Sequence, residues 1–223
     1  MRLLRYSESG ELSTHSFNDG TIPAYAIFSH TWGEDGAEVT FADLETGVGK
    51  TKSGYKKIVF CGDQARCDNL QYFWIDTCCI DTTDKAEHSC AIQSMLRWYR
   101  FAAKCYVYLW DVSTKKREAR RRPSDMSWEP AFRSSRWFTR GWTLQELLAP
   151  TIVEFFSQEG EKLGDKTSLM LSIYKIISIP PEVLNGAPLS QSSINERLRW
   201  AEGRTIKHSE DRHTLCKASS TLS

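Results

Sequence analysis

Four short apolar runs, each bounded by polar or turn-forming residues, stand out along the chain. They cover residues 24–29, 72–75, 105–109 and 152–156. Their length and their content of aromatic and β-branched side chains are typical of strands. Because apolar residues follow one another instead of alternating with polar ones, we expect strands that are covered on both faces.

Between the second and third runs, apolar residues recur at spacings of three and four: Ile92, Met95, Leu96, Tyr99 and Ala103. This spacing places them on one face of a helix. Asp84 is suited to cap the start of that helix, and Glu87, three residues later, is placed to complete a capping box. Residues 54–65 form a second predicted helix, and residues 142–148 a short one that Pro150 ends.

Strands that alternate with helices predict right-handed crossovers. The expected fold is therefore α/β, with a doubly wound parallel sheet and helices on both faces. A length of 223 residues suits a single domain. Residues 113–127 hold too few apolar residues to offset the entropy of ordering them, and we expect an exposed loop that folding does not require.

The charges nearly cancel, with 29 Lys and Arg against 28 Asp and Glu. This balance argues against a nucleic-acid partner, which normally needs a basic excess; the one local excess is the run at residues 115–122. That run is interpreted as a solvated loop, with a nuclear-import signal as the alternative. Neither a signal-peptide core nor a run of about 18 apolar residues occurs, so we expect a cytoplasmic protein without a membrane span.

The seven cysteines are odd in number and lie mainly inside apolar segments: Cys61, Cys67, Cys78, Cys79, Cys90, Cys105 and Cys216. We expect reduced, buried thiols and no disulfide framework. In an extended segment the adjacent Cys78 and Cys79 point to opposite faces, and no two cysteines have ligand spacing. No metal site is predicted.

Two polar clusters follow the first two predicted strands, where open parallel sheets bind ligands. The first contains Ser29, His30, Trp32 and Gly33, and the second runs from Asp76 to Asp81. Trp32 offers a stacking face, Gly33 permits an unusual turn, and the two aspartates offer acceptors for ribose hydroxyls. The alternative is that the polar side chains only satisfy loop backbone groups, and composition alone favours it.

Residues 135–150 hold more candidate functional side chains than any other segment of the chain. On the short helix predicted there, Leu144, Leu147 and Leu148 form an apolar face, and Trp142, Gln145 and Glu146 form another. A carboxylate beside an aromatic ring suits proton or oxocarbenium chemistry. A surface glutamate paired with Arg140 is the alternative.

Six segments resemble, in order and spacing, the successive blocks of the fungal heterokaryon incompatibility (HET) domain. They are YAIFSHTWG (25–33), VTFADL (39–44), GYKKI (54–58), YFWIDTCCID (72–81), AIQSMLRWYRFAAKCYVYLWDV (91–112) and SRWFTRGWTLQELLAP (135–150). The first thirteen residues and residues 197–212 are similar to the flanking blocks. We therefore expect a HET domain over residues 1–212 and a polar tail over 213–223. HET domains usually continue further, so the C-terminal part is expected to be truncated.

The resemblance implies a protein of fungal nonself recognition that triggers programmed cell death. It further implies a flavodoxin-like sheet, since the HET domain is remotely similar to the Toll/interleukin-1 receptor (TIR) domain, and some TIR domains cleave NAD. By that analogy NAD is the candidate substrate, no cofactor is required, and Glu146 is the candidate catalytic residue. The walls of the expected NAD pocket are Ser29, His30, Trp32, Gly33, Asp76, Asp81 and Trp142.

The resemblance leaves two functions open. One is the NAD-hydrolysing enzyme, and the other is a non-enzymatic module that signals cell death by assembly. In both cases we expect protein partners of nonself recognition and self-association. A nucleic-acid-binding protein is a third hypothesis, which rests on residues 115–122 alone.

Overall fold

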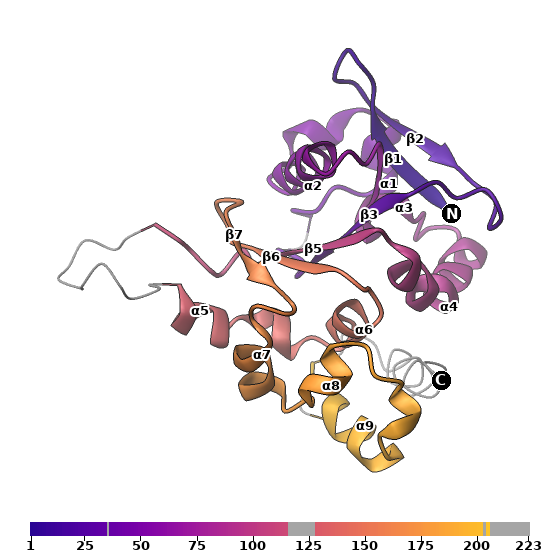
Figure 1. Ribbon diagram of the computed structural model, residues 1–223. Coiled ribbons are helices and arrows are strands. Elements are labelled where there is room, and N and C mark those ends of the chain that lie inside the picture. The colour runs from indigo at the N-terminus through magenta and orange to yellow at the C-terminus, as the bar shows by residue number, and fades with distance from the viewer. Residues whose placement is uncertain (35, 116–127, 203, 206–223) are drawn as a thin grey trace. The chain divides into compact units, whose positions relative to one another are not determined.

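The computed structural model describes residues 1–34, 36–115, 128–202 and 204–205 (Figure 1). The chain forms two compact units. The first is Met1–Tyr106 together with Ala149–Thr151, and the second is Val107–Leu148 together with Ile152–Ser223.

The first unit holds the N-terminal strands and helices. Its elements are β1 (Arg2–Tyr6), β2 (Leu12–Ser16), β3 (Tyr25–His30), α1 (Phe41–Glu45), the 3₁₀-helix η1 (Val48–Thr51), α2 (Tyr55–Cys67), β4 (Tyr72–Trp74), α3 (Asp76–Cys79), α4 (Lys85–Phe101) and most of β5 (Lys104–Tyr108). The second unit holds the end of β5 and then α5 (Glu129–Arg133), η2 (Arg136–Thr139), α6 (Thr143–Leu148), β6 (Val153–Phe156), β7 (Lys162–Asp165), α7 (Met170–Ile177), α8 (Pro181–Leu184), η3 (Leu189–Gln191) and α9 (Ile194–Ala201).

The sheet of the first unit has the strand order β2-β1-β4-β3-β5. β3 and β4 are parallel, with Tyr25 opposite Tyr72 and Ile27 opposite Trp74. β1 runs antiparallel to both β2 and β4. The predicted α/β class is confirmed. The N-terminal hairpin of β1 and β2, which the apolar pattern did not predict, makes the sheet mixed.

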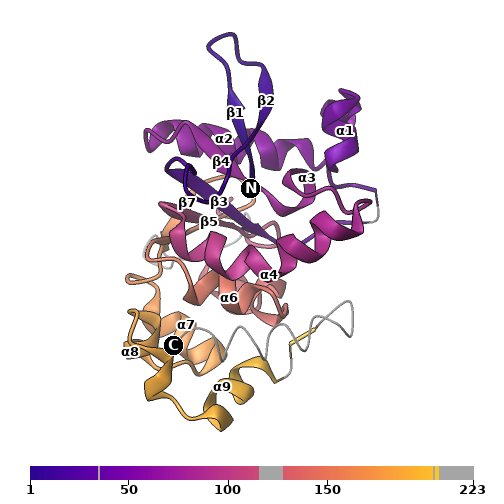
Figure 2. The ribbon, with the colours of Figure 1, turned by 90° about the vertical axis from the view of Figure 1, so that its right-hand side faces the viewer.

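Helices cover both faces of this sheet, as predicted (Figure 2). Successive residues of a strand point to opposite faces. On one face of β3, Phe28 meets Phe60 of α2. On the other face, the hydroxyl of Tyr25 donates to the backbone oxygen of Trp98 in α4. α2 approaches β1 closely because Gly62 has no side chain: a Cβ there would clash with the ring of Tyr6.

The four predicted strands agree with the structure to within a residue or two at each end. Residues 24–29 correspond to β3, 72–75 to β4, 105–109 to β5 and 152–156 to β6. All six residues of β3 and all four of β6 are buried. This confirms that continuous apolar runs mark strands covered on both faces.

The helix after Asp84 is confirmed as α4, but two details of the prediction are wrong. Asp84 accepts from the backbone N–H groups of Ala86 and Glu87, as a cap should. The Glu87 carboxylate does not complete a capping box; it binds the backbone N–H of Asp81 instead, at 2.9 Å. Ala103 lies beyond the end of α4, and its N–H donates to Tyr25.

The segment after β4 differs from the extended loop that we expected. Asp76–Cys79 forms one helical turn, α3, so Cys78 and Cys79 do not lie on opposite faces of a strand. Burial raises the pKa of the Cys61 thiol, and a hydrogen bond with Cys79 together with burial raises that of Cys78. Such thiols are inert as nucleophiles.

The expectation of buried thiols holds for four cysteines. Cys61, Cys78, Cys79 and Cys105 are buried, whereas Cys67 and Cys90 are exposed. All six are free thiols, and Cys216 lies outside the described residues.

An aromatic cluster forms the core of the second unit. Phe132, Trp137, Phe138 and Phe155 meet edge to face or stacked, with ring centroids between 5.1 and 6.4 Å apart. β6 pairs antiparallel with β7. The backbone of Leu109, just after β5, donates to Phe156 of β6.

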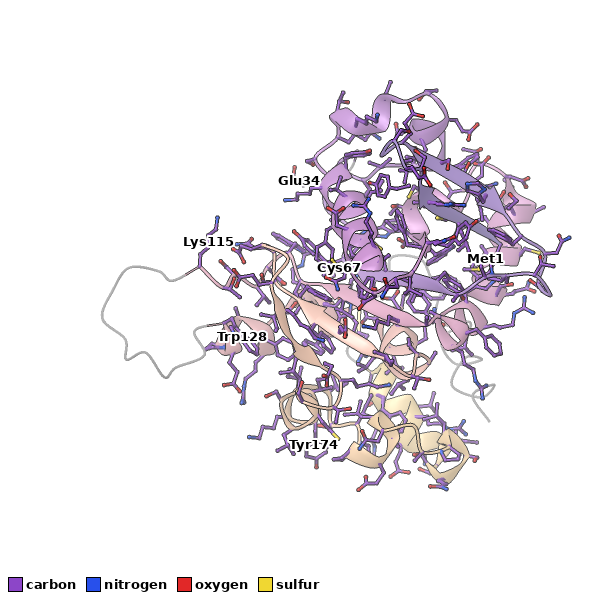
Figure 3. All side chains as sticks on the ribbon, turned by 45° about the horizontal axis from the view of Figure 1, so that its top comes forward. Met1, Glu34, Cys67, Lys115, Trp128 and Tyr174 are labelled. Carbon is purple, nitrogen blue, oxygen red and sulfur yellow. The ribbon has the colours of Figure 1, made fainter. Side chains whose placement is uncertain are left out.

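Most of the loop predicted at residues 113–127 and the tail predicted at 213–223 lie outside the described residues. Lys115 and Trp128 are the described residues on either side of the loop (Figure 3). Its start is anchored, since Ser113 and Thr114 donate to the carboxylate of Glu159. None of the helices in the described part of the chain is long and apolar enough to cross a membrane.

Candidate functional site

The end of β3 places a buried imidazole between two carboxylates. His30 has only 1% of its side chain exposed; its Nε2 lies 3.6 Å from Glu38 and its Nδ1 lies 3.8 Å from Asp76. Within the described residues neither ring nitrogen has a hydrogen-bond partner. A buried polar group without a partner is costly, and such groups often mark functional sites. The ring also packs on Phe28, with centroids 5.0 Å apart.

Asp76 connects this imidazole to the ring of Trp32, which was predicted as a stacking face. The indole N–H of Trp32 donates to Asp76 at 2.8 Å. The other carboxylate oxygen accepts from the backbone N–H of Thr77, at the start of α3. Trp32 itself is 41% exposed. Asp76 therefore fixes a flat ring that is open to a ligand at the carboxyl end of β3.

Glu38 and Lys57 belong to the same cluster, and neither was predicted from the sequence. The Lys57 ammonium binds the Glu38 carboxylate and donates to the backbone oxygen of Thr31 at 3.2 Å. Glu38 also accepts from the backbone N–H of Gly33 at 2.7 Å. Lys57 lies four residues before the buried Cys61 on α2. Lys57 could therefore have been predicted as a site residue, because a lysine on the buried face of a helix is unusual.

Gly33 does not make the unusual turn that its residue type permits, and its place in the pocket wall stays a prediction. Gly33 does not adopt a left-handed backbone conformation. A Cβ there would make ordinary contacts of 3.5 Å with Ala37 and Glu38. What the position contributes is its backbone N–H, which helps to hold Glu38 near His30.

The neighbours of Glu38 control its ionisation. Burial is the largest single influence and raises the pKa, but the neighbouring imidazole of His30 and the ammonium of Lys57, which binds the carboxylate, outweigh it and lower the pKa to about 2. Glu38 is therefore ionised at any physiological pH.

This lowered pKa predicts how stability depends on acid. The pKa is depressed in the folded state, so the stabilisation is complete above the unfolded value of 4.5 and is lost as the pH falls toward 2. We expect Glu38→Gln to cost about 1–2 kcal/mol at pH 6, with solvent screening allowed for. The difference in unfolding free energy between this variant and the wild type should be smaller at pH 3, as measured by urea unfolding. Glu34→Gln, an exposed neighbour, is the control; parallel profiles for the wild type and Glu38→Gln would contradict the assignment.

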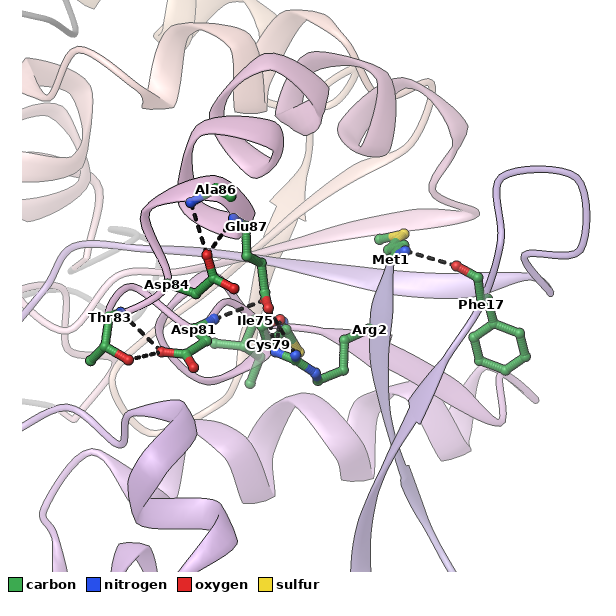
Figure 4. Close-up of polar contacts among 10 residues, drawn as sticks. All are labelled: Met1, Arg2, Phe17, Ile75, Cys79, Asp81, Thr83, Asp84, Ala86 and Glu87. Atoms are coloured by element: carbon green, nitrogen blue, oxygen red, sulfur yellow. Dashed lines mark hydrogen bonds and ion pairs between the residues drawn. The ribbon is translucent and has the colours of Figure 1, made fainter.

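Asp81 lies in a different arrangement within the first unit. Its carboxylate accepts from the backbone N–H and the hydroxyl of Thr83, and its own N–H binds Glu87 (Figure 4). Glu87 forms a two-point ion pair with Arg2, at 2.9 and 3.0 Å. The hydrogen bonds of Asp81 thus close a turn, in keeping with the alternative interpretation that polar side chains here satisfy loop backbone groups.

In the second unit, each of the two faces predicted for α6 holds two buried residues. Leu144 and Leu147 are 5% and 0% exposed, and Gln145 and Glu146 are 3% and 6% exposed. Trp142, just before the helix, is half-buried. Glu146 is therefore not a surface glutamate. Its place in one pocket with the residues of the first unit stays a prediction.

Arg204 introduces a second charge near Glu146. The Arg204 guanidinium donates to the backbone oxygens of Trp200 and Arg140 and to the hydroxyl of Thr143. Burial lowers the pKa of Arg204 to about 10, and the negative charge of Glu146 opposes that shift. The half-buried Arg204 guanidinium thus lies close enough to the buried Glu146 for their opposite charges to interact.

The backbone next to Arg204 also pairs with the segment that starts α6. The N–H of Thr205 donates to Thr139 at 2.6 Å, and the N–H of Gly141 donates back to Thr205 at 3.1 Å. Arg140 and Thr205 form a parallel bridge. The segment 204–205 therefore fixes the turn that carries Trp142 and Glu146.

Comparisons with known proteins show which family the chain resembles. A family model described as "Heterokaryon incompatibility protein (HET)" matches residues 25–130, which include Ser29, His30, Asp76 and Asp81 but not Glu146. The chain is 52% identical over 212 residues to the vegetative incompatibility protein HET-E-1 of Podospora anserina. The match covers 95% of this chain but 15% of HET-E-1, so the chain spans a small part of that relative. No solved structure matches the chain significantly.

Proposed function

Because the chain belongs to the heterokaryon incompatibility (HET) family, we propose that it acts in fungal nonself recognition and triggers programmed cell death by hydrolysing NAD. The supporting observation is the cluster at the end of β3. There Asp76 holds the exposed ring of Trp32 beside the buried imidazole of His30. An open aromatic face with adjacent carboxylates suits a nucleotide with its ribose hydroxyls.

The proposed reaction breaks the bond between the ribose C1′ and the nicotinamide nitrogen. The bonding electrons leave with nicotinamide, which becomes neutral, and the sugar passes through a cation-like transition state. Water adds to C1′ and loses a proton, so the products are nicotinamide, ADP-ribose and a proton. Glu146 is assigned the stabilisation of the positive sugar, a role for which a fixed carboxylate is suited.

One observation favours the alternative, a non-enzymatic module that signals by assembly. Glu146 already has a cationic neighbour in Arg204. A carboxylate whose charge is partly neutralised in this way stabilises a second cation less, and buried ion pairs are common in purely structural settings. The two functions differ in whether the protein consumes NAD.

Expression in yeast distinguishes them. If the chain kills by hydrolysing NAD, cellular NAD should fall before viability does, and Glu146→Gln should abolish both effects at equal protein level. The two measurements are an enzymatic assay of NAD in extracts and colony counts. Killing by Glu146→Gln without loss of NAD would instead establish the assembly module.

A further inference from the structure

β2 is an edge strand, and half of its backbone groups point away from the sheet. Met1 and Phe17 exchange both hydrogen bonds, and the N–H of Ser7 donates to Glu11. Hydrogen-bonded pairs recur at every second residue of an antiparallel ladder, so the backbone groups of His15 and Ser13 also face β1. Leu12, Thr14 and Ser16 therefore direct their N–H and C=O groups outward. Within the described residues no backbone partner meets these groups.

Natural edge strands usually carry features that prevent further pairing, such as charges, prolines or bulges. β2, with the sequence LSTHS, has none of these, and its register with β1 is unbroken over five residue pairs. By contrast, β7 carries Lys162 and Asp165, and its pairing with β6 shifts register. β2 is thus an edge without the usual protection.

A groove of about 460 Å³ follows this edge, within the usual range for ligand clefts. Its strand side is formed by four consecutive residues, from Glu11 to Thr14. These four residues include Leu12 and Thr14, whose N–H and C=O groups point outward, so the groove borders this part of the edge. The opposite wall includes Leu44, Glu45 and Lys50, from α1 and η1.

The charge of the groove indicates which kind of extended peptide it would bind. Glu11 and Glu45 have no ion-pair partner among the described residues, and Lys50 is the single cation left to oppose them. Asp43 is already bound by Lys52 at 2.5 Å. The groove therefore presents an excess of negative charge, which complements a basic segment.

We propose that β2 binds an extended, basic peptide segment of a partner protein, which adds a strand to the sheet. Alternate residues of the peptide exchange backbone hydrogen bonds with Leu12, Thr14 and Ser16, and a lysine or arginine side chain meets Glu11 or Glu45. This interaction requires neither NAD nor Glu146, so it stands apart from the proposed enzyme activity.

The probe is a synthetic library of heptapeptides with β-branched and basic residues at mixed positions, selected on the 223-residue chain. Selected peptides should be enriched in lysine and arginine. In a bound peptide only alternate N–H groups face β2. N-methylation of that set of residues should weaken binding roughly tenfold, and N-methylation of the other set should leave binding unchanged. Equal effects of the two methylation patterns, or no enrichment of basic peptides, would overturn the proposal.

Variants of β2 provide a second test. Thr14→Pro removes an outward N–H that the sheet does not use, and proline is tolerated at such edge positions. We expect it to weaken binding roughly tenfold, whereas Thr14→Val, which keeps the N–H, should bind normally. Glu45→Gln should weaken binding a few-fold, and Glu34→Gln, outside the groove, should not. Equal binding by the proline variant would contradict the assignment; should that variant fail to fold in a thermal melt, the N-methylated peptides decide.

Discussion

Glu146→Gln should lower the rate of NAD cleavage by roughly 10²- to 10³-fold, the usual cost of removing one charge-stabilising group from an active site. The substitution keeps the shape of a buried side chain that is 6% exposed. The fold should therefore survive, and the loss should fall on kcat more than on KM, because the carboxylate acts on the transition state. The measurement is the initial rate of nicotinamide release.

Glu182→Gln is the matched control for this prediction. Glu182 is an exposed glutamate of α8 in the same unit, and its substitution should leave the rate unchanged. Thermal melting of both variants checks the fold. If Glu146→Gln cleaved NAD as fast as the wild type, NAD would remain the substrate, but the catalytic role would belong to another residue.

Arg204→Met should destabilise the protein by about 1.5–3 kcal/mol, the range for hydrogen bonds that involve a charged group. The substitution removes a cationic neighbour from Glu146 and one hydrogen bond each from acceptors on Trp200, Arg140 and Thr143. Urea unfolding measures the change. Arg199→Met, an exposed position on α9, should cost less than about 0.5 kcal/mol.

A double-mutant cycle shows whether the two charges act on each other. Because Gln at position 146 carries no charge, Arg204→Met should cost less in a Glu146→Gln background, with a coupling of about 1–3 kcal/mol. Strictly additive effects would mean that Arg204 stabilises the turn only through its hydrogen bonds to the backbone and to Thr143.

The parts of the fold that were predictable are those in which local sequence and burial agree. The apolar runs around Ile27 and Phe155 predicted β3 and β6, because a strand covered on both faces needs consecutive apolar residues. The helix that begins after Asp84 was predicted for the same reason, with Met95 and Tyr99 on its buried face.

β1 and β2 were missed because their pairing, and not their composition, makes them strands. In β1 only Leu3 and Leu4 are fully buried, between the charged Arg2 and Arg5. β2 has no fully buried residue. Strands of this kind are specified by the neighbours with which they form hydrogen bonds, and a local pattern does not contain that information.

The candidate site was predictable only in part, for a similar reason. His30, Trp32 and Asp76 were identified because they lie at the ends of apolar strands, and both His30 and Trp32 do lie against Asp76. Glu38 lies in a polar loop, and Arg204 lies far along the chain from the helix that it holds. Their roles follow from tertiary contacts alone. Lys57, on the buried face of α2, is the exception that helical periodicity could have revealed.

The most direct test of the central claim is to incubate the purified chain with NAD in water enriched in ¹⁸O and to analyse the products by mass spectrometry. Hydrolysis predicts equal amounts of nicotinamide and ADP-ribose, with one ¹⁸O atom in the ADP-ribose, since water supplies the oxygen that replaces nicotinamide at C1′. Intact NAD after incubation with protein that a thermal melt shows to be folded would contradict the account and leave the assembly module in its place.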